Sequence, residues 1–346
     1  MNLERGNLTM SVGENILNLR KEKGLSQESL AEKMCVSRQT ISQWEKDQTL
    51  PTVDNLLRLK EIFDVSVDKV LNENGIVDTD MNANSIDTVC AALCYAAGVK
   101  PPKFASEKNY ELANYIDKVF DGEKADRILM YNPDAIGEWI YRKYIDYLAH
   151  TVKNTDIEIP LASAMPSVTP VNFASMYTGA QPHMHGIQKY ERPVLSVETI
   201  FDAFIKAGKR CAIVASKKCS VGMIFLERDM DYYLYENSVD GNAKAVELIL
   251  RDEYDLLVVY NGNYDSVMHK NGPESAKALS ELRVNDTMFS IISKLVKEHW
   301  KNHNTLVGFA MDHGCHEIDG DCGSHGLYTA EDINIVHRYK GYKREN

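Results

Sequence analysis

The sequence predicts an α/β domain, with a largely parallel sheet flanked by helices, preceded by a small all-helical domain. From residue 125 onward, short apolar runs alternate with amphipathic segments, which is typical of a parallel sheet with helices on both faces. Residues 12–71 carry helical spacing instead, with polar residues suited to cap each segment. The length of 346 residues also suits two domains better than one, because single cores stop growing at roughly 250–300 residues.

A polar, acidic stretch marks the expected boundary between the two domains. Residues 73–84 are polar and acidic and contain few large apolar side chains, which is typical of a linker. We therefore expect a helical domain over residues 1–72 and an α/β domain over residues 85–346.

Composition limits the compartment and the partners. The longest nearly uncharged apolar stretch, residues 89–99, is too short to cross a bilayer, and residues 1–10 do not resemble a signal peptide, so we expect a cytoplasmic protein without a membrane partner. The seven cysteines are then expected to be free thiols. A net charge of −11 argues against a large sequence-independent nucleic-acid surface.

The N-terminal part reads as short helices joined by tight turns. Ser26, Ser37 and Thr52 are suited to cap the helices that follow them, and Gly24 is suited to end the first helix. The expected helices are 12–23, 27–34, 38–47, 53–63 and 65–72.

The tight turn between the second and third helices is typical of a helix-turn-helix, with residues 38–47 as the recognition helix. Ile41 and Trp44 are expected in the core, while polar side chains on the other face can read base edges and phosphates. The candidate DNA-contacting residues are Gln27, Ser37, Arg38, Gln39, Thr40 and Gln43.

This stretch resembles the XRE-type helix-turn-helix family along its whole length. The resemblance implies DNA binding through residues 1–72, as a homodimer on paired half-sites. The alternative is a helical interaction module that does not bind DNA. Residues 1–72 hold ten basic and eleven acidic side chains, so DNA binding must come from the local placement of charge.

The second domain alternates strands and helices. The expected strands are 125–132, 157–164, 210–216, 231–236, 255–261 and 304–312. The expected helices are 85–98, 106–120, 138–152, 171–179, 196–208, 242–252 and 275–300. In such sheets ligands collect at the carboxyl ends of the strands.

Aspartate, histidine and threonine residues follow four of these strand ends. They are Asp134, Thr169, Asp265, His269, Asp312, His313 and, after a glycine-rich loop, His325. Together they predict a carboxylate and imidazole cage for two divalent metal ions, zinc or alternatively manganese. Such a pair of ions supports phosphoryl transfer.

The segments PSVTPVNFASMYTGAQPHMHGI, NYDSVMHKNGPES and DHG followed by GSHG resemble the metal motifs of the alkaline phosphatase superfamily. The nearest branch is the type I phosphodiesterase/nucleotide pyrophosphatase enzymes, over residues 125–335. The resemblance implies a small phosphorylated substrate and a nucleophilic Thr169 that passes through a phosphothreonine. It assigns Asp265, His269 and His325 to one metal, and Asp134, Asp312 and His313 to the other. Sulfatases of this superfamily need Cys or Ser at the nucleophile position, so Thr169 counts against sulfatase activity.

Four further residues are candidates to contact the substrate. Asn172 and the backbone near Thr169 are candidates to stabilise the phosphoryl oxygens. Lys217 and Lys218, after an expected strand, are candidates to bind an anionic substrate, although a solvated loop is the slightly favoured explanation for both. Where the family places an Asn after its His-Gly-Ile segment, this chain has Lys189 nearby as a possible source of charge.

Two alternatives to a phosphodiesterase remain open at this point. One is a transcriptional regulator whose metal domain senses a phosphorylated ligand. The other is a phosphonate hydrolase that cleaves a C–P bond, for which the two lysines would suit a carboxylate-bearing substrate.

Overall fold

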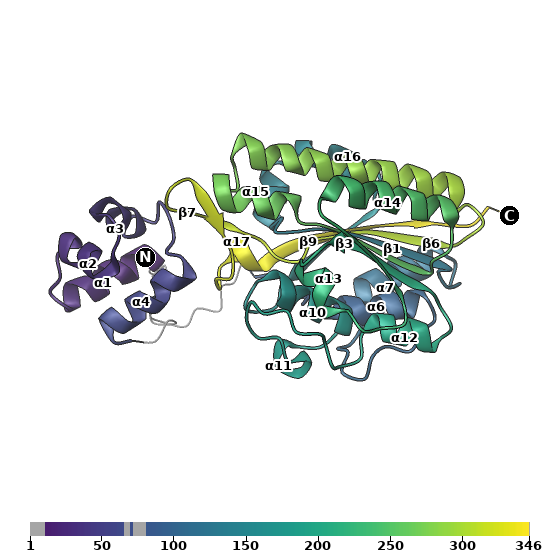
Figure 1. The fold of residues 1–346 in the computed structure, drawn as a ribbon, viewed down its shortest axis with the longest axis horizontal. Helices are drawn as coiled ribbons and strands as arrows, with labels where there is room; N and C mark the ends of the chain where they lie inside the picture. Colours follow the sequence, from purple (N-terminus) through teal and green to yellow (C-terminus); the bar gives the residue numbers. More distant parts are fainter. Residues whose placement is uncertain (1–10, 66–69, 72–80, 346) are drawn as a thin grey trace, which may run out of the picture. The chain divides into compact units, whose positions relative to one another are not determined.

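The structure is a computed structural model that describes residues 11–65, 70–71 and 81–345 of the chain (Figure 1). The chain forms two compact units. The first unit combines the residues up to 80 with the short segment His316–Ser324, and the second combines Met81–Cys315 with His325–Asn346. Segment 316–324, expected within the second domain, therefore belongs to the first unit. The expected linker lies mostly outside the described residues.

The first unit begins as a bundle of short helices. They are α1 (Val12–Glu22), α2 (Gln27–Met34), α3 (Arg38–Trp44) and α4 (Val53–Phe63). Ser26, Ser37 and Thr52 each accept a hydrogen bond from the first turn of the following helix, as predicted. Ile41 and Trp44 are buried, also as predicted. The expected fifth helix, 65–72, falls largely outside the described residues.

The helix that corresponds to the recognition helix ends at Trp44, three residues before its expected end. Glu45 follows it and is buried. Its carboxylate accepts hydrogen bonds from the Arg20 guanidinium, one of them at 3.0 Å. This ion pair ties the segment after α3 to α1, and Asp47, at φ +53°, takes the chain out of the helical conformation.

A small hairpin completes the first unit. Strands β7 (His316–Ile318) and β8 (Cys322–Ser324) pair in an antiparallel register, with His316 opposite Ser324. The turn between them places Gly320 at φ +81° and Asp321 at φ +55°, backbone conformations that Gly and Asp tolerate best. The sequence pattern did not predict this hairpin, because each strand has only three residues.

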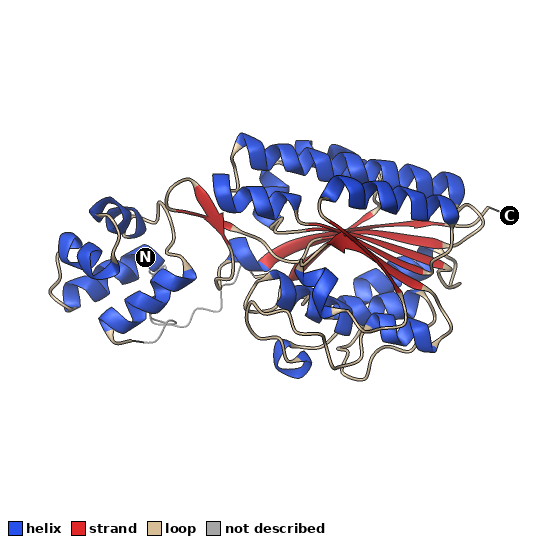
Figure 2. Cartoon of the chain, viewed as in Figure 1, coloured by secondary structure: helices blue, strands red, loops and turns tan. Residues whose placement is uncertain are grey.

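The second unit is built on a seven-stranded sheet in the order β2-β9-β6-β1-β5-β3-β4. Figure 2 shows its strands in red between two layers of helices. All neighbouring strands are parallel except β9, which runs antiparallel to both β2 and β6. The strands are β1 (Arg127–Pro133), β2 (Ile157–Ala162), β3 (Cys211–Ser216), β4 (Asp231–Tyr235), β5 (Leu256–Asn261), β6 (Thr305–Ala310) and β9 (Asn334–Tyr342).

Helices cover both faces of this sheet, as the alternating sequence pattern predicted. On one face lie α14 (Ser238–Arg251), α15 (Asn263–Asn271) and α16 (Ala276–His299) (Figure 1). On the other lie α6 (Thr88–Ala96), α7 (Tyr110–Val119), α10 (Thr169–Thr178), α12 (Ile200–Lys206) and α13 (Ser220–Ile224). The connecting helices are α8 (Glu138–Lys143), η1 (Ile145–Leu148), α9 (Ala149–Lys153), α11 (Pro182–His185) and α17 (Ala330–Ile333).

Two expectations for this unit need correction. The helix expected over residues 138–152 is divided into α8, η1 and α9, because Tyr144 and Leu148 leave the α-helical conformation. Strand β9 was not predicted at all, since it carries charged side chains inside a sheet. Its Arg338 is buried and pairs with Glu158 on β2, which explains how a charged residue fits there.

The part of the chain that the structure describes contains no helix long and apolar enough to cross a membrane.

Candidate active site

Five segments bring the predicted metal ligands and nucleophile to one edge of the sheet. Strands β1, β2, β5 and β6 run in the same direction, so their carboxyl ends share an edge, and antiparallel β9 begins at that edge. The residues placed there are Asp134 after β1, Thr169 at the start of α10, Asp265 and His269 on α15, Asp312 and His313 after β6, and His325 ahead of β9.

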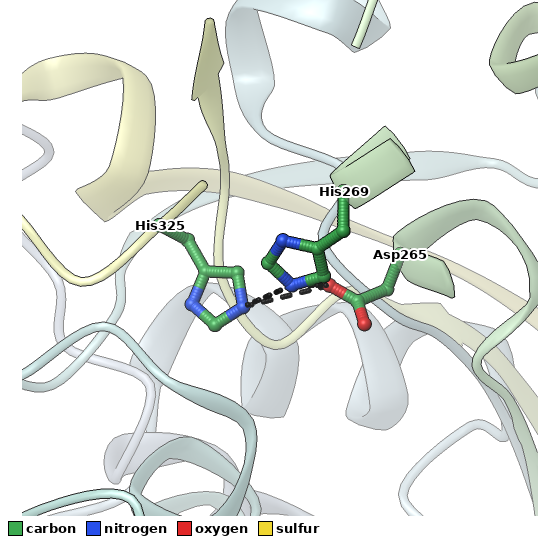
Figure 3. A group of neighbouring side chains, drawn as sticks. All are labelled: Asp265, His269 and His325. Atoms are coloured by element: carbon green, nitrogen blue, oxygen red, sulfur yellow. Dashed lines mark hydrogen bonds and ion pairs between the residues drawn. The ribbon is translucent and has the colours of Figure 1, made fainter. Parts of the chain in front are cut away.

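Asp265, His269 and His325 form the first cluster (Figure 3). The His269 Nε2 atom lies 3.2 Å from Asp265 Oδ1 and 3.2 Å from His325 Nε2. Asp265 lies in the first turn of α15 and His269 four residues later, so one helical turn sets their spacing. The three ligand atoms therefore converge on one point, as metal ligands do.

Asp134, Asp312 and His313 form the second cluster, and all three are buried. The His313 Nε2 atom lies 3.4 Å from Asp134 Oδ1 and 3.3 Å from Asp312 Oδ2. The rings of His313 and His325 have centroids 4.2 Å apart, so the two clusters adjoin.

The backbone orients two of the imidazoles. His313 Nδ1 lies 2.9 Å from the Gly314 carbonyl oxygen, and His325 Nδ1 lies 3.2 Å from that of Ser167. A carbonyl oxygen only accepts, so each Nδ1 carries the proton and each Nε2 presents its lone pair to the cluster. This is the tautomer that a metal-binding histidine requires.

Burial dominates the electrostatics of the second cluster. Burial, followed by the charge of Asp312, raises the pKa of Asp134 well above its usual value, and burial raises the pKa of Asp312 to about 8. Burial also lowers the pKa of His313, which stays neutral. Asp265 differs: burial acts to raise its pKa, but the neighbouring imidazoles of His269 and His325 outweigh that effect and lower it.

The residues of the second cluster fit a divalent cation. Asp134 Oδ1 and Asp312 Oδ2 are buried and accept no hydrogen bond from any described residue. Buried oxygens normally have a partner, and two carboxylate oxygens beside an imidazole nitrogen are a donor set that zinc or manganese accepts.

Thr169 lies against this cluster at the first residue of α10. Its hydroxyl oxygen is 3.2 Å from His313 Nε2 and 3.5 Å from Asp134 Oδ2, and the residue is 4% exposed. The N-terminus of a helix attracts anions, so a phosphoryl group next to Thr169 would be stabilised by α10.

Tyr260 is a site residue that the sequence analysis missed. Its hydroxyl donates a hydrogen bond to Asp134 Oδ2, and its ring packs edge-on against Phe173 with centroids 5.5 Å apart. Its place near the carboxyl end of a predicted strand was the available signal. However, an aromatic residue in a strand is normally interpreted as part of the hydrophobic core unless the partner of its hydroxyl group is known.

A close approach of three backbone segments supports the second cluster. A Cβ atom added to Gly314, directly after His313, would lie 1.9 Å from the Glu331 carbonyl oxygen, and one added to Gly137 would lie 2.7 Å from the same atom. The Gly314 N–H donates to the Asp332 carbonyl at 2.8 Å. Only glycine fits at residue 314, so the backbone of the ligand segment is held in direct contact with its neighbour.

Asn172 is placed differently from the expectation that it stabilises phosphoryl oxygens. It is fully buried, and its Oδ1 accepts from the Ala164 N–H at 2.6 Å. Its Nδ2 donates to the carbonyls of Ala164 and Val168 at 3.2 and 3.3 Å. Both amide atoms are occupied by the loop that precedes Thr169, so Asn172 holds that loop in place.

The three lysines that are candidates to bind substrate lie on the surface of loops. The Lys189 ammonium lies 3.4 Å from Glu191, and that of Lys217 lies 3.0 Å from Glu236. Lys218 occupies the left-handed region at φ +61°. Among the described contacts, none joins these ammonium groups to either cluster, which agrees with the solvated-loop interpretation.

In the first unit, only part of the polar face of α3 is exposed to solvent. Arg38 and Gln39 are exposed, and Thr40 and Gln43 are half-buried. Arg38 pairs with Glu28 at 2.7 Å, a contact between two exposed side chains.

Ser37 and Gln27 have internal partners. Ser37 Oγ caps α3 by accepting from the Thr40 N–H at 3.0 Å. The Gln27 amide donates to Glu45 at 2.8 Å, and the side chain is half-buried; its contact with a DNA phosphate stays a prediction.

Comparison with known proteins defines the class of each part. Residues 132–341 match the family described as type I phosphodiesterase / nucleotide pyrophosphatase, and residues 16–70 match the family described as helix-turn-helix. The chain therefore belongs to the type I phosphodiesterase/nucleotide pyrophosphatase family and carries a helix-turn-helix domain ahead of it. Both resemblances drawn from the sequence are confirmed.

Individual relatives match one part of the chain or the other. The HTH-type transcriptional activator BcrR of Enterococcus faecalis is 35% identical over 68 residues, 20% of this chain and 33% of that protein. The HTH-type transcriptional regulator SinR of Bacillus licheniformis is 33% identical over 101 residues, 29% of this chain and 91% of that protein.

Murine ectonucleotide pyrophosphatase/phosphodiesterase 5 is a structural neighbour with 18% identity and a TM-score of 0.46, covering 56% of this chain and 58% of that one. The chain thus spans only part of the length of BcrR and of the murine protein.

Proposed function

We propose that the second unit is a two-metal phosphodiesterase in which Thr169 is the nucleophile, joined to a unit that binds specific DNA. The observation that carries this proposal is the Thr169 hydroxyl, 3.2 Å from His313 Nε2 and directly beside a buried cluster of two carboxylates and an imidazole. Asp265, His269 and His325 would hold one ion, and Asp134, Asp312 and His313 the other, with zinc preferred because the ligands mix oxygen and nitrogen.

The residues of the chain would divide the reaction into two displacements. Bound cations would supply the positive charge that activates a hydroxyl and neutralises phosphoryl oxygens. The Thr169 hydroxyl gives up its proton to solvent as its oxygen attacks phosphorus in line. The bond from phosphorus to the opposite alcohol or phosphate group breaks, that group leaves with the bonding electrons and an alkoxide takes up a proton, and a phosphothreonine forms. Water then attacks the same phosphorus and restores the threonine. The N-terminus of α10 faces the phosphoryl anion throughout, and Asn172 keeps the preceding loop in register.

The nucleophile is tested by hydrolysis of bis(p-nitrophenyl) phosphate with added zinc or manganese. Thr169→Ala should lower kcat by about a thousandfold or more, while elemental analysis shows its metal content unchanged. Thr169→Ser is the matched control, because it keeps a hydroxyl at the same place, and it should retain measurable turnover. Wild-type activity in Thr169→Ala would rule out the nucleophile.

The DNA-binding part of the proposal rests on membership of the first unit in the helix-turn-helix family and on the exposed side chains of Arg38 and Gln39. We propose that it binds a paired site as a dimer. Selection of duplexes from a random pool by the full-length protein should yield an inverted repeat. Recovery of no preferred sequence at low salt would contradict the regulator function.

We prefer the phosphodiesterase to the phosphonate alternative, for which Lys217 and Lys218 were expected to suit a carboxylate-bearing substrate. Lys217 pairs with Glu236 at 3.0 Å instead.

A further inference from the structure

The hairpin of β7 and β8 lies in the sequence between ligands of both clusters. His313 precedes it by two residues, Gly314 and Cys315, and His325 follows directly after Ser324. The chain leaves the second unit after Cys315, contributes the hairpin to the first unit, and returns to the second unit at His325. The loop that connects two metal ligands is therefore also a structural part of the helix-turn-helix unit.

Within the first unit, the hairpin contacts the end of the recognition helix and the turn after it. Thr49, in the turn between α3 and α4, donates its hydroxyl to Asp319 Oδ1 at 2.9 Å. Burial raises the pKa of Asp319, and the neighbouring Thr49 hydroxyl and Trp44 indole act against that rise. Trp44 is the last residue of α3. The tip of the hairpin thus supports α3 from the end opposite to Arg38 and Gln39.

Within the second unit, the two ends from which the hairpin emerges are firmly held. On the entering side, the Cys315 carbonyl accepts from the Trp139 indole at 2.7 Å. On the returning side, His325 Nδ1 is bound to the Ser167 carbonyl, and the Leu327 N–H donates to Asp332 at 2.7 Å. Each end of the hairpin is therefore tied to the second unit within two residues of a proposed ligand.

We infer that hairpin 316–324 couples occupancy of the metal clusters to DNA binding, so that the metal-loaded protein binds its DNA site more tightly than the metal-free protein. This inference rests on the proposed metal site. Without cations, no common partner ties the oxygens of Asp134, Asp265 and Asp312 to the imidazoles beside them, so the ligand segments are less firmly joined to one another. Cations draw them together and fix the spacing of the hairpin's two ends, which favours the state in which Asp319 meets Thr49.

The test measures DNA affinity by fluorescence anisotropy, with a fluorescein-labelled duplex selected by the zinc-loaded full-length protein. The same preparation is measured zinc-loaded and after removal of metal with a chelator. We expect stripping to raise the Kd of the wild type about tenfold, within the usual range of coupling between sites. An unchanged Kd, in protein shown by elemental analysis to gain and lose zinc, overturns the coupling and leaves the proposed hydrolase standing.

Two variants separate the hairpin contact from other effects of zinc. Thr49→Val removes the donor at nearly constant volume, and Asp319→Ala removes the acceptor. In both, the ratio of stripped to loaded Kd should fall toward one, while zinc content and hydrolysis of bis(p-nitrophenyl) phosphate stay at wild-type levels. Asp321→Asn, in the same turn, is the control and should keep the tenfold ratio.

The outcomes are distinct. A tenfold ratio that survives in both Thr49→Val and Asp319→Ala overturns the inference. Protein that binds no zinc at all contradicts the proposed metal site itself, and the coupling with it.

Discussion

Replacing Asn172 by alanine tests whether this residue supports the loop before Thr169 or acts on the substrate. The change removes three hydrogen bonds, of 2.6, 3.2 and 3.3 Å, from a fully buried side chain. At about 1 kcal/mol for each, the second unit should lose about 3 kcal/mol of unfolding free energy. For a unit of this size, that loss lowers the Tm by about 6–12 °C.

The assay combines thermal unfolding with hydrolysis of bis(p-nitrophenyl) phosphate below the transition. We expect a lower Tm together with a lower kcat, because Thr169 loses its fixed position. Asn154→Ala is the control: it removes a hydrogen bond of 2.7 Å to the His150 carbonyl at an exposed site, so its free energy of unfolding should change by less than about 0.5 kcal/mol. A normal Tm with a collapsed kcat in Asn172→Ala would refute the supporting role and return Asn172 to the phosphoryl group.

Three further predictions concern the metal site and the DNA-binding face. Adding zinc to metal-free protein at pH 7 should release protons, because burial raises the pKa of Asp312 to about 8 and also raises that of Asp134. The number of protons released should fall as the pH passes 8, which titration calorimetry in buffers of different ionisation enthalpy can measure. Zinc binding without proton release would contradict the raised pKa values. Tyr260→Phe removes the hydroxyl that orients Asp134 but keeps the ring against Phe173, so zinc affinity should fall about tenfold, and an unchanged affinity would leave Tyr260 with a packing role only. Gln39→Ala should weaken binding to the selected duplex by about tenfold. The Tm of the first unit should not change, since the side chain is exposed. Equal binding to all sequences by wild type and variant would contradict the proposal that Gln39 reads a base.

The sequence was most informative where chemistry follows directly from position along a strand. Asp134, Asp265 and Asp312 each follow an apolar run, and parallel strands place such residues at one edge whatever the details of packing. Helix caps at Ser26, Ser37 and Thr52 were predictable for a similar reason, because a capping side chain acts on the backbone three residues away.

Features that depend on distant partners could not be predicted in this way. Arg338 makes β9 look like a surface segment until Glu158 is placed beside it. The hydrogen bond from the Gln27 amide to Glu45 and those from the Asn172 amide to the loop before Thr169 could not be predicted either, because they depend on how the chain folds back on itself. A polar side chain in a sequence shows that it can form a hydrogen bond but not which partner it has.

The glycine after His313 carries a consequence for natural variation. With the Glu331 carbonyl where a Cβ atom would stand, residue 314 admits no substitution that keeps the adjoining backbone in place. Alanine or any larger residue at this place would push the segment after β6 away from Glu331, and His313, the residue before it, would move as well.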